Sequence, residues 1–213
     1  MTFTRAIGVG AGAIIKLIVR GLALAKIHPN VLTFIGLLIN IYAAILLAQG
    51  RFLAAGLVIA GAGIFDMVDG RVARATGQVT RFGGFFDSVL DRYSDLALLM
   101  GLLVYYANIG RNFYVVLTAV VMTASVMISY TRSRSENTIP SCKVGFLERP
   151  ERVVLIIIGA LFDRMAPVLW VIAVVGNITV IHRMWHTWLV TKSMEEKDAA
   201  GAGSALQDHV SQA

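Results

Sequence analysis

Residues 31–49 read VLTFIGLLINIYAAILLAQ and contain no charged side chain. As a helix, a run of about 20 apolar residues is long enough to cross the roughly 30 Å hydrocarbon layer of a bilayer. The rest of the chain has the same character, since 57% of its 213 residues are hydrophobic and 15% are charged, against about 25% charged in ordinary soluble domains. The composition therefore excludes a soluble domain and predicts a membrane protein.

Five further apolar stretches follow the first one along the chain. We place the six predicted transmembrane helices at 31–49, 52–70, 84–108, 113–131, 148–162 and 166–185. The fifth has the shortest apolar run, and it requires a helix that begins near Pro150 and a hairpin turn at 163–167. A single re-entrant segment is the alternative there. The predicted fold is an all-α integral membrane protein with six transmembrane helices.

The segments that flank these spans differ from them in composition. Residues 1–27 would place Arg5, Lys16 and Arg20 on one side of a helix and isoleucines on the opposite side, which predicts an amphipathic helix on the membrane surface. A secretory signal is the alternative, but no clear cleavage site of small residues precedes Lys16. Residues 191–213 are polar and rich in small side chains, so we expect a disordered tail. The six-helix domain would then span residues 28–190.

The basic residues indicate the orientation of the helices. Of the 19 Lys and Arg residues, Arg51, Arg111 and Arg164 fall on one side of the predicted membrane and Arg92 within a span, while the other 15 fall on the opposite side. Basic loops face the cytoplasm, so both termini and the basic loops are expected on the cytoplasmic side of the cell membrane. The net charge of +6 is distributed between apolar segments rather than gathered into a groove-binding patch, so no nucleic-acid partner is expected.

Five aspartates lie in or at the ends of the second and third predicted spans: Asp66, Asp69, Asp87, Asp91 and Asp95. An unpaired carboxylate at mid-bilayer costs about 2.5–3.5 kcal/mol, so the cluster needs arginines or a bound cation. The first two, at i, i+3, share one face of a helix, and the last three, at i, i+4 and i+8, share one face of the next. An oxygen-only ligand set suits Mg²⁺ or Mn²⁺, and four carboxylates suffice for two ions. Asp95 lies about 6 Å deeper than Asp91 and is expected to contact a neighbouring helix instead of metal.

These aspartates belong to a longer motif. Asp66-x-x-Asp69-Gly70-x-x-Ala73-Arg74, eight residues, then Gly83-x-x-x-Asp87-x-x-x-Asp91 resembles the signature of the CDP-alcohol phosphotransferase (phosphatidyltransferase) family. The resemblance implies transfer of a phosphatidyl group from CDP-diacylglycerol to an alcohol, with release of CMP. It implies two divalent ions, Mg²⁺ or Mn²⁺, per active site, held by Asp66, Asp69, Asp87 and Asp91, and it makes Asp91 the catalytic general base.

The same resemblance implies a binding site for the CDP-lipid. Its residues here are Asn30, Asp66, Asp69, Gly70, Ala73, Arg74, Thr80 and Gly83. Arg74 would hold the diphosphate, because its planar fork of donors matches phosphate oxygens. Asn30 could equally be only a helix cap. A homodimer in the membrane is also implied.

Three later segments indicate the acceptor alcohol. Residues 87–95, 129–136 and 145–152 are similar to those of bacterial phosphatidylinositol-phosphate synthases, which implies inositol phosphate as the acceptor. The candidate contacts to its phosphate are Ser129, Arg132, Arg149, Arg152 and Arg183. Several arginines suit a phosphate dianion, although any one of them could merely follow the positive-inside rule. That branch often has Lys in place of Arg132.

Two other functions are compatible with the sequence. The same chemistry could use glycerol phosphate or another alcohol as acceptor. A non-catalytic cation transporter or channel would also place carboxylates inside a membrane, but such a protein is expected to show inverted repeats, and we find none.

Overall fold

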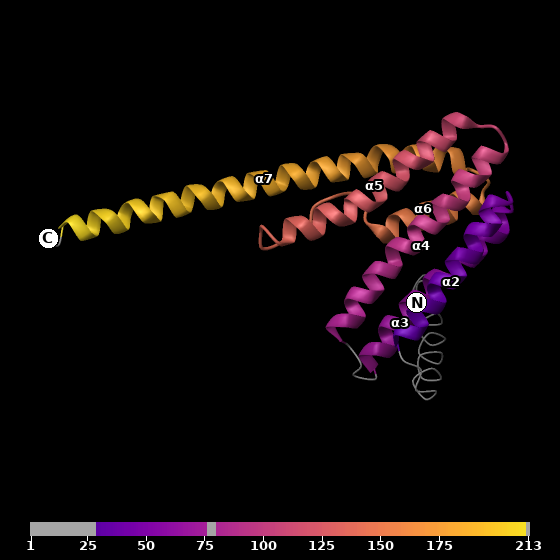
Figure 1. Ribbon diagram of the computed structural model, residues 1–213, viewed down its shortest axis with the longest axis horizontal. Coiled ribbons are helices and arrows are strands. Elements are labelled where there is room, and N and C mark those ends of the chain that lie inside the picture. The colour runs from indigo at the N-terminus through magenta and orange to yellow at the C-terminus, as the bar shows by residue number, and fades with distance from the viewer. Residues whose placement is uncertain (1–28, 76–79, 212–213) are drawn as a thin grey trace, which may run out of the picture.

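The computed structural model describes residues 29–75 and 80–211, which form helices and no strand. The helices are α2 (Pro29–Ala48), α3 (Phe52–Ala75), α4 (Arg81–Asn108), α5 (Asn112–Glu136), α6 (Arg149–Leu161) and α7 (Met165–Ser211) (Figure 1). Each begins close to the start of a predicted span, which confirms the all-α fold for the described part of the chain. The interfacial helix predicted at 1–27 lies outside the described residues.

A short turn joins α6 to α7. The helix α6 ends at Leu161 and α7 begins at Met165, with Asp163 at φ 51° between them. The turn is therefore shorter than the hairpin predicted at 163–167, and it separates two distinct helices. Because α6 has 13 residues, it extends only about 20 Å.

The end of α7 differs from the predicted disorder. The helix continues through residues 191–211 to Ser211 and extends well beyond the other helices (Figure 1). Alanine, glutamate and lysine, which are frequent there, are strong helix formers, and Lys192 Nζ lies 4.0 Å from Glu196 Oε1 one turn on. Helix propensity thus extends α7 past the apolar segment that we used to predict its end.

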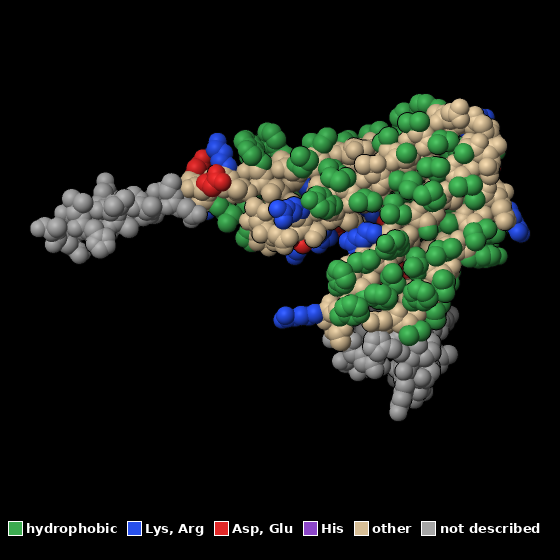
Figure 2. Space-filling view, in the orientation of Figure 1, with side chains coloured by type: hydrophobic (Ala, Val, Ile, Leu, Met, Phe, Trp, Pro, Cys, Tyr) green, Lys and Arg blue, Asp and Glu red, His purple; other side chains and the backbone are tan. Residues whose placement is uncertain are grey.

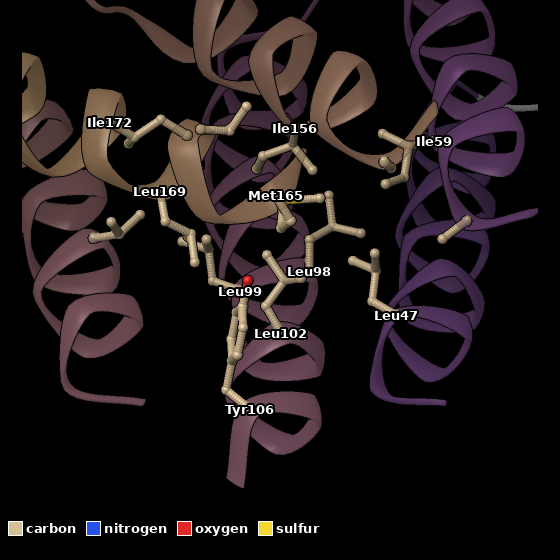
Figure 3. Close-up of a cluster of buried hydrophobic side chains, with 14 of the residues drawn as sticks. Leu47, Ile59, Leu98, Leu99, Leu102, Tyr106, Ile156, Met165, Leu169 and Ile172 are labelled. Carbon is tan, nitrogen blue, oxygen red and sulfur yellow. The ribbon is translucent and has the colours of Figure 1, made fainter. Parts of the chain in front are cut away.

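The helices pack into two groups that meet at α4. One group is formed by α2, α3 and α4, and the other by α5 and α7, with α6 against α3 and α7. Figure 3 shows the apolar contact between them: Leu98, Leu99 and Leu102 of α4, each at most 2% exposed, pack among side chains of α2, α3, α6 and α7. At Gly101 a Cβ atom would overlap the backbone of Ala44, so a glycine is needed where α4 crosses α2.

Three helical segments are long and apolar enough to cross a membrane: Asn30–Ala48, Asn112–Glu136 and Met165–Lys197. Their outward faces carry large apolar side chains such as Phe34, Val116 and Ile181, which are 48–65% exposed. Figure 2 shows hydrophobic side chains over much of the visible face of these helices. A soluble protein rarely exposes so large an apolar surface, so the chain is a membrane protein.

Candidate active site

Carboxylates of α3 and α4 meet at one arginine. Arg149, the first residue of α6, contacts Asp66 of α3 (Nη2 to Oδ2, 3.1 Å), Asp91 of α4 (Nη1 to Oδ1, 2.9 Å) and Asp95 of α4 (Nε to Oδ1, 3.4 Å). The side chains of Asp66 and Asp91 are 28% and 20% exposed, so solvent still reaches this cluster. The acidic faces of α3 and α4 therefore converge on a cation, as the spacing of the aspartates predicts.

Asp95 lies deeper and has a second arginine partner. Its Oδ2 accepts a hydrogen bond of 2.6 Å from Arg152 Nη2, and the two side chains are only 9% and 4% exposed. This ion pair joins α4 to α6 below the point where Arg149 meets the other carboxylates. The structure thus places Asp95 between helices, as we expected from its depth.

The start of α6 determines where both arginines point. The backbone N–H of Glu148, the N-cap residue, donates to Glu151 Oε2 at 2.9 Å, and Pro150 occupies the first turn, where its missing N–H costs nothing. Arg149 and Arg152 are three residues apart on this helix and therefore share the face toward α4.

Glu148 also holds the other two predicted acceptor arginines. Its Oε1 lies 3.1 Å from Arg132 Nη1 and 3.0 Å from Arg183 Nη2. Arg183 is 1% exposed, and it also donates to the carbonyl oxygens of Val144 (2.8 Å) and Ile128 (2.5 Å). Arg183 is thus occupied by protein partners, and Arg132 remains partly open to solvent.

Two cavities adjoin the carboxylate cluster and share Asp95 and Arg149 in their walls. The larger, of about 490 Å³, is mainly apolar and lies among α2, α3, α4 and α6; Asp66 reaches it beside Ile59, Ile64 and Val153. The smaller, of about 100 Å³, is polar, and its lining residues are Asp91, Arg92, Asp95, Ser129, Arg149 and Arg152. Figure 2 shows Lys and Arg side chains where α5 and α7 meet the other helices.

The predicted nucleotide residues that the structure describes lie at the starts of α2 and α4. Thr80 is the N-cap of α4, and its Oγ1 accepts a hydrogen bond of 2.9 Å from the Gly83 N–H. A Cβ atom at Gly83 would lie 3.3 Å from Asn30 Oδ1, so this glycine permits the close approach of α2. Thr80 thus has a structural role besides the predicted one.

The remaining predicted residues are either exposed or have side chains that lie outside the described ones. Asp87 is exposed, one turn of α4 before Asp91. Asp69, Gly70, Ala73 and Arg74 lie on the last turns of α3, and their side chains lie outside the described ones.

Two residues of the site were missed in the sequence. A Cβ atom at Gly36 of α2 would lie 3.0 Å from Asp66 Oδ1, so this glycine makes room for the carboxylate. In the sequence Gly36 is one residue in an apolar run, and its only distinguishing sign is Asn40 one turn later, whose Nδ2 donates to the Gly36 carbonyl at 3.0 Å. Glu148 lies within the segment 145–152, and nothing in its spacing indicates that it joins two arginines.

The donor atoms suit a hard divalent ion. Asp66 and Asp91 each direct a carboxylate oxygen at the Arg149 guanidinium, through different nitrogen atoms, and oxygen ligands are those that Mg²⁺ and Mn²⁺ prefer. Among the side chains that are described, no group of three acidic, His or Cys residues is close enough to hold one ion. The other two aspartates of the motif are Asp69, whose side chain lies outside the described ones, and Asp87, which is exposed one turn before Asp91.

Comparison with known proteins identifies the family of the chain. The family model for CDP-alcohol phosphatidyltransferases matches residues 26–190. The chain is 36% identical over 165 residues to archaetidylinositol phosphate synthase of Pyrococcus horikoshii, which covers 77% of this chain and 85% of the relative. It is 33% identical over 197 residues to phosphatidylinositol phosphate synthase of Mycobacterium tuberculosis, an alignment that covers 87% of this chain and 91% of the relative.

Solved structures of the mycobacterial enzyme have the same fold. The crystal structure with CDP-DAG bound has a TM-score of 0.77 at 33% identity, covering 83% of this chain and 94% of that one. The structure in complex with manganese and citrate has a TM-score of 0.76 at 32% identity, and the match covers 82% of this chain and 88% of that one. The chain therefore belongs to the CDP-alcohol phosphatidyltransferase family of divalent-metal-dependent membrane transferases.

Proposed function

We propose that this protein transfers a phosphatidyl group from CDP-diacylglycerol to inositol phosphate and releases CMP. Family membership supports the reaction type, and the relatives named as inositol phosphate synthases support the acceptor. The observation that carries the proposal is the polar cavity, in which Asp91 lies beside Ser129, Arg149 and Arg152. A carboxylate and two guanidiniums around one small space suit a hydroxyl group that also bears a phosphate.

The larger cavity suits the lipid part of the donor. Its walls are mainly apolar, and Asp66 and Arg149 lie at its polar end. The cytidine would lie toward Asn30, Thr80 and Gly83, at the starts of α2 and α4. The predicted contacts of Asp69, Gly70, Ala73 and Arg74 with the donor belong to the same proposal, because the last turns of α3 lead away from Asp66 in that direction.

Asp91 is suited to the proton transfer that the reaction needs. The acceptor hydroxyl oxygen forms a bond to the phosphorus that carries diacylglycerol, the bond from that phosphorus to the CMP oxygen breaks, and Asp91 takes the hydroxyl proton. Arg149 and Arg152 would hold the acceptor phosphate. Arg183 would support it through Glu148, because it already has protein partners for its donors, whereas Arg132, which is partly open to solvent, would contact the phosphate directly.

We propose that Asp66, Asp69, Asp87 and Asp91 hold two divalent ions, Mg²⁺ or Mn²⁺. Bound there, the ions would neutralise charge on the diphosphate and polarise the attacked phosphorus. The mutual approach of Asp66 and Asp91 supports this ligand set.

The membrane arrangement is part of the same proposal. We propose six spans, with an interfacial helix before them and with both termini and the active site on the cytoplasmic side of the cell membrane. Arg132 lies on the last turns of α5 and Arg149 at the start of α6, at the side that the charge count places in the cytoplasm, which supports that orientation through the positive-inside rule. The homodimer implied by the family resemblance is part of the proposal.

Release of CMP from CDP-diacylglycerol tests the function directly. We expect purified protein with Mn²⁺ to release CMP in the presence of inositol phosphate, and more slowly or not at all with inositol or glycerol phosphate. Faster CMP release with glycerol phosphate would identify glycerol phosphate as the acceptor instead. No CMP release with any of the three alcohols would favour a transporter. Asp91→Asn should abolish transfer and retain CDP-lipid binding, because it removes the proton acceptor and keeps the side-chain shape; full activity of this variant would refute the general base.

A further inference from the structure

We propose that Arg149 is a built-in counter-ion of the metal site, which pairs with the carboxylates when divalent ions are absent and competes with those ions for them. Metal loading would thereby release Arg149 to bind the acceptor phosphate. The inference rests on the proposed function in two respects: it takes Asp66 and Asp91 as metal ligands and Arg149 as an acceptor residue.

The contacts of Arg149 explain why the two cations compete. One guanidinium lies 3.1 Å from Asp66 Oδ2 and 2.9 Å from Asp91 Oδ1, so it stands between a carboxylate of α3 and one of α4. A hard divalent ion ligated by these carboxylates would lie about 2.0–2.1 Å from their oxygens. Two positive charges this close to one pair of carboxylates repel each other strongly. Binding of metal and pairing with Arg149 therefore oppose each other, even where each uses a different oxygen of one carboxylate.

The position of Arg149 also connects the metal site with the acceptor cavity. Its side chain lines both cavities and is 28% exposed, so it has room to turn from the carboxylates toward Ser129 and Arg152. While it pairs with Asp66 and Asp91, it has fewer donors for an anionic acceptor. Metal and acceptor should therefore bind with positive coupling, and thermodynamic linkage makes that coupling equal in both directions.

The other arginines of the site do not have this position. Arg152 pairs with Asp95, which lies outside the motif, and its side chain is buried. Arg132 pairs with Glu136 and Glu148. Substituting Arg132 removes the same charge from the same end of the protein without freeing a motif aspartate, so it provides a matched control.

The test measures Mn²⁺ affinity in purified protein without CDP-lipid or acceptor, by the electron paramagnetic resonance signal of free Mn²⁺. Arg149→Gln should bind Mn²⁺ about tenfold more tightly than the wild type, within the 5- to 150-fold range usual for coupled sites. Arg132→Gln should stay within about twofold, since general charge effects at exposed sites are small.

Arg149→Lys keeps the charge and carries the test if Arg149→Gln does not fold. A lysine ammonium cannot bridge three carboxylates as a planar guanidinium does, so Mn²⁺ should still bind more tightly than in Arg132→Lys. Unchanged affinity in the Arg149 variants, or an equal gain in the matched Arg132 variants, would overturn the proposal.

A second measurement separates this inference from the proposed function. In the wild type, Mn²⁺ should raise the affinity for inositol phosphate, and Arg149→Gln should abolish that coupling. If inositol phosphate neither binds nor supports CMP release while Arg149→Gln still gains Mn²⁺ affinity, the acceptor is wrong and the counter-ion stands. If the wild type releases CMP with inositol phosphate but Arg149→Gln binds Mn²⁺ no more tightly than the wild type, the proposed function stands and the counter-ion role of Arg149 is refuted.

Discussion

Replacing Asp95 with leucine should destabilise the protein strongly, because it leaves Arg152 as a buried charge without a partner. The two side chains are 9% and 4% exposed, and their 2.6 Å contact is the shortest ion pair among the described residues. Arg152 Nη1 has no hydrogen-bond partner among the described residues, and the pair with Asp95 is the only ion pair of Arg152 there. Removal of one member of a buried pair costs about 3–5 kcal/mol, and we expect a loss of that size in the free energy of unfolding.

A double-mutant cycle distinguishes the lost pair from lost packing. Asp95→Leu combined with Arg152→Met should recover most of the loss, since apolar residues of similar volume replace buried ion pairs at little cost. Glu136→Ala is the control, because it breaks the half-exposed pair with Arg132 and should cost less than about 1 kcal/mol. Unfolding in mixed detergent micelles measures the free energy of unfolding of each of these variants. A loss for Asp95→Leu no larger than the control's, or a double variant no better than the single one, would refute the reasoning.

Three further predictions concern the packing and the acceptor site. Gly101→Ala should lower the free energy of unfolding by about 1–3 kcal/mol, because the added Cβ meets the backbone of α2. The control is Gly61→Ala, which has open space around it, and equal losses in the two variants would contradict the expected clash. Glu148→Gln should cost about 1–3 kcal/mol in the same assay, because it weakens the charged partner of buried Arg183; wild-type stability would count against that role. Arg149→Ala should weaken binding of inositol phosphate far more than of CDP-diacylglycerol when both are titrated against one preparation, and equal losses would argue against an acceptor pocket there.

The sequence was sufficient for the helices and for the approach of two acidic faces. Continuous apolar runs locate the starts of α2 to α7, because length and hydrophobicity are what a bilayer selects. The spacing of Asp66, Asp91 and Asp95 places their side chains toward neighbouring helices, where the structure has them.

The contacts of individual arginines could not be predicted in the same way. Arg132, Arg149, Arg152 and Arg183 look alike in the sequence, since each lies at a basic end of a span. Their differences arise from packing: Arg183 is enclosed by α5 and the loop before α6, whereas Arg149 stands between α3 and α4. The far end of α7 differed from expectation because its helix depends on local propensity and not on an apolar face.

Binding of Mn²⁺ to the aspartates of α3 and α4 tests the central claim most directly. Titration of the purified protein should show two ions per chain, and Asp66→Asn combined with Asp91→Asn should abolish the tight sites while the Asp95→Asn variant keeps them. Two sites that survive unchanged in the Asp66 and Asp91 double variant, or no saturable Mn²⁺ binding in the wild type, would contradict the account.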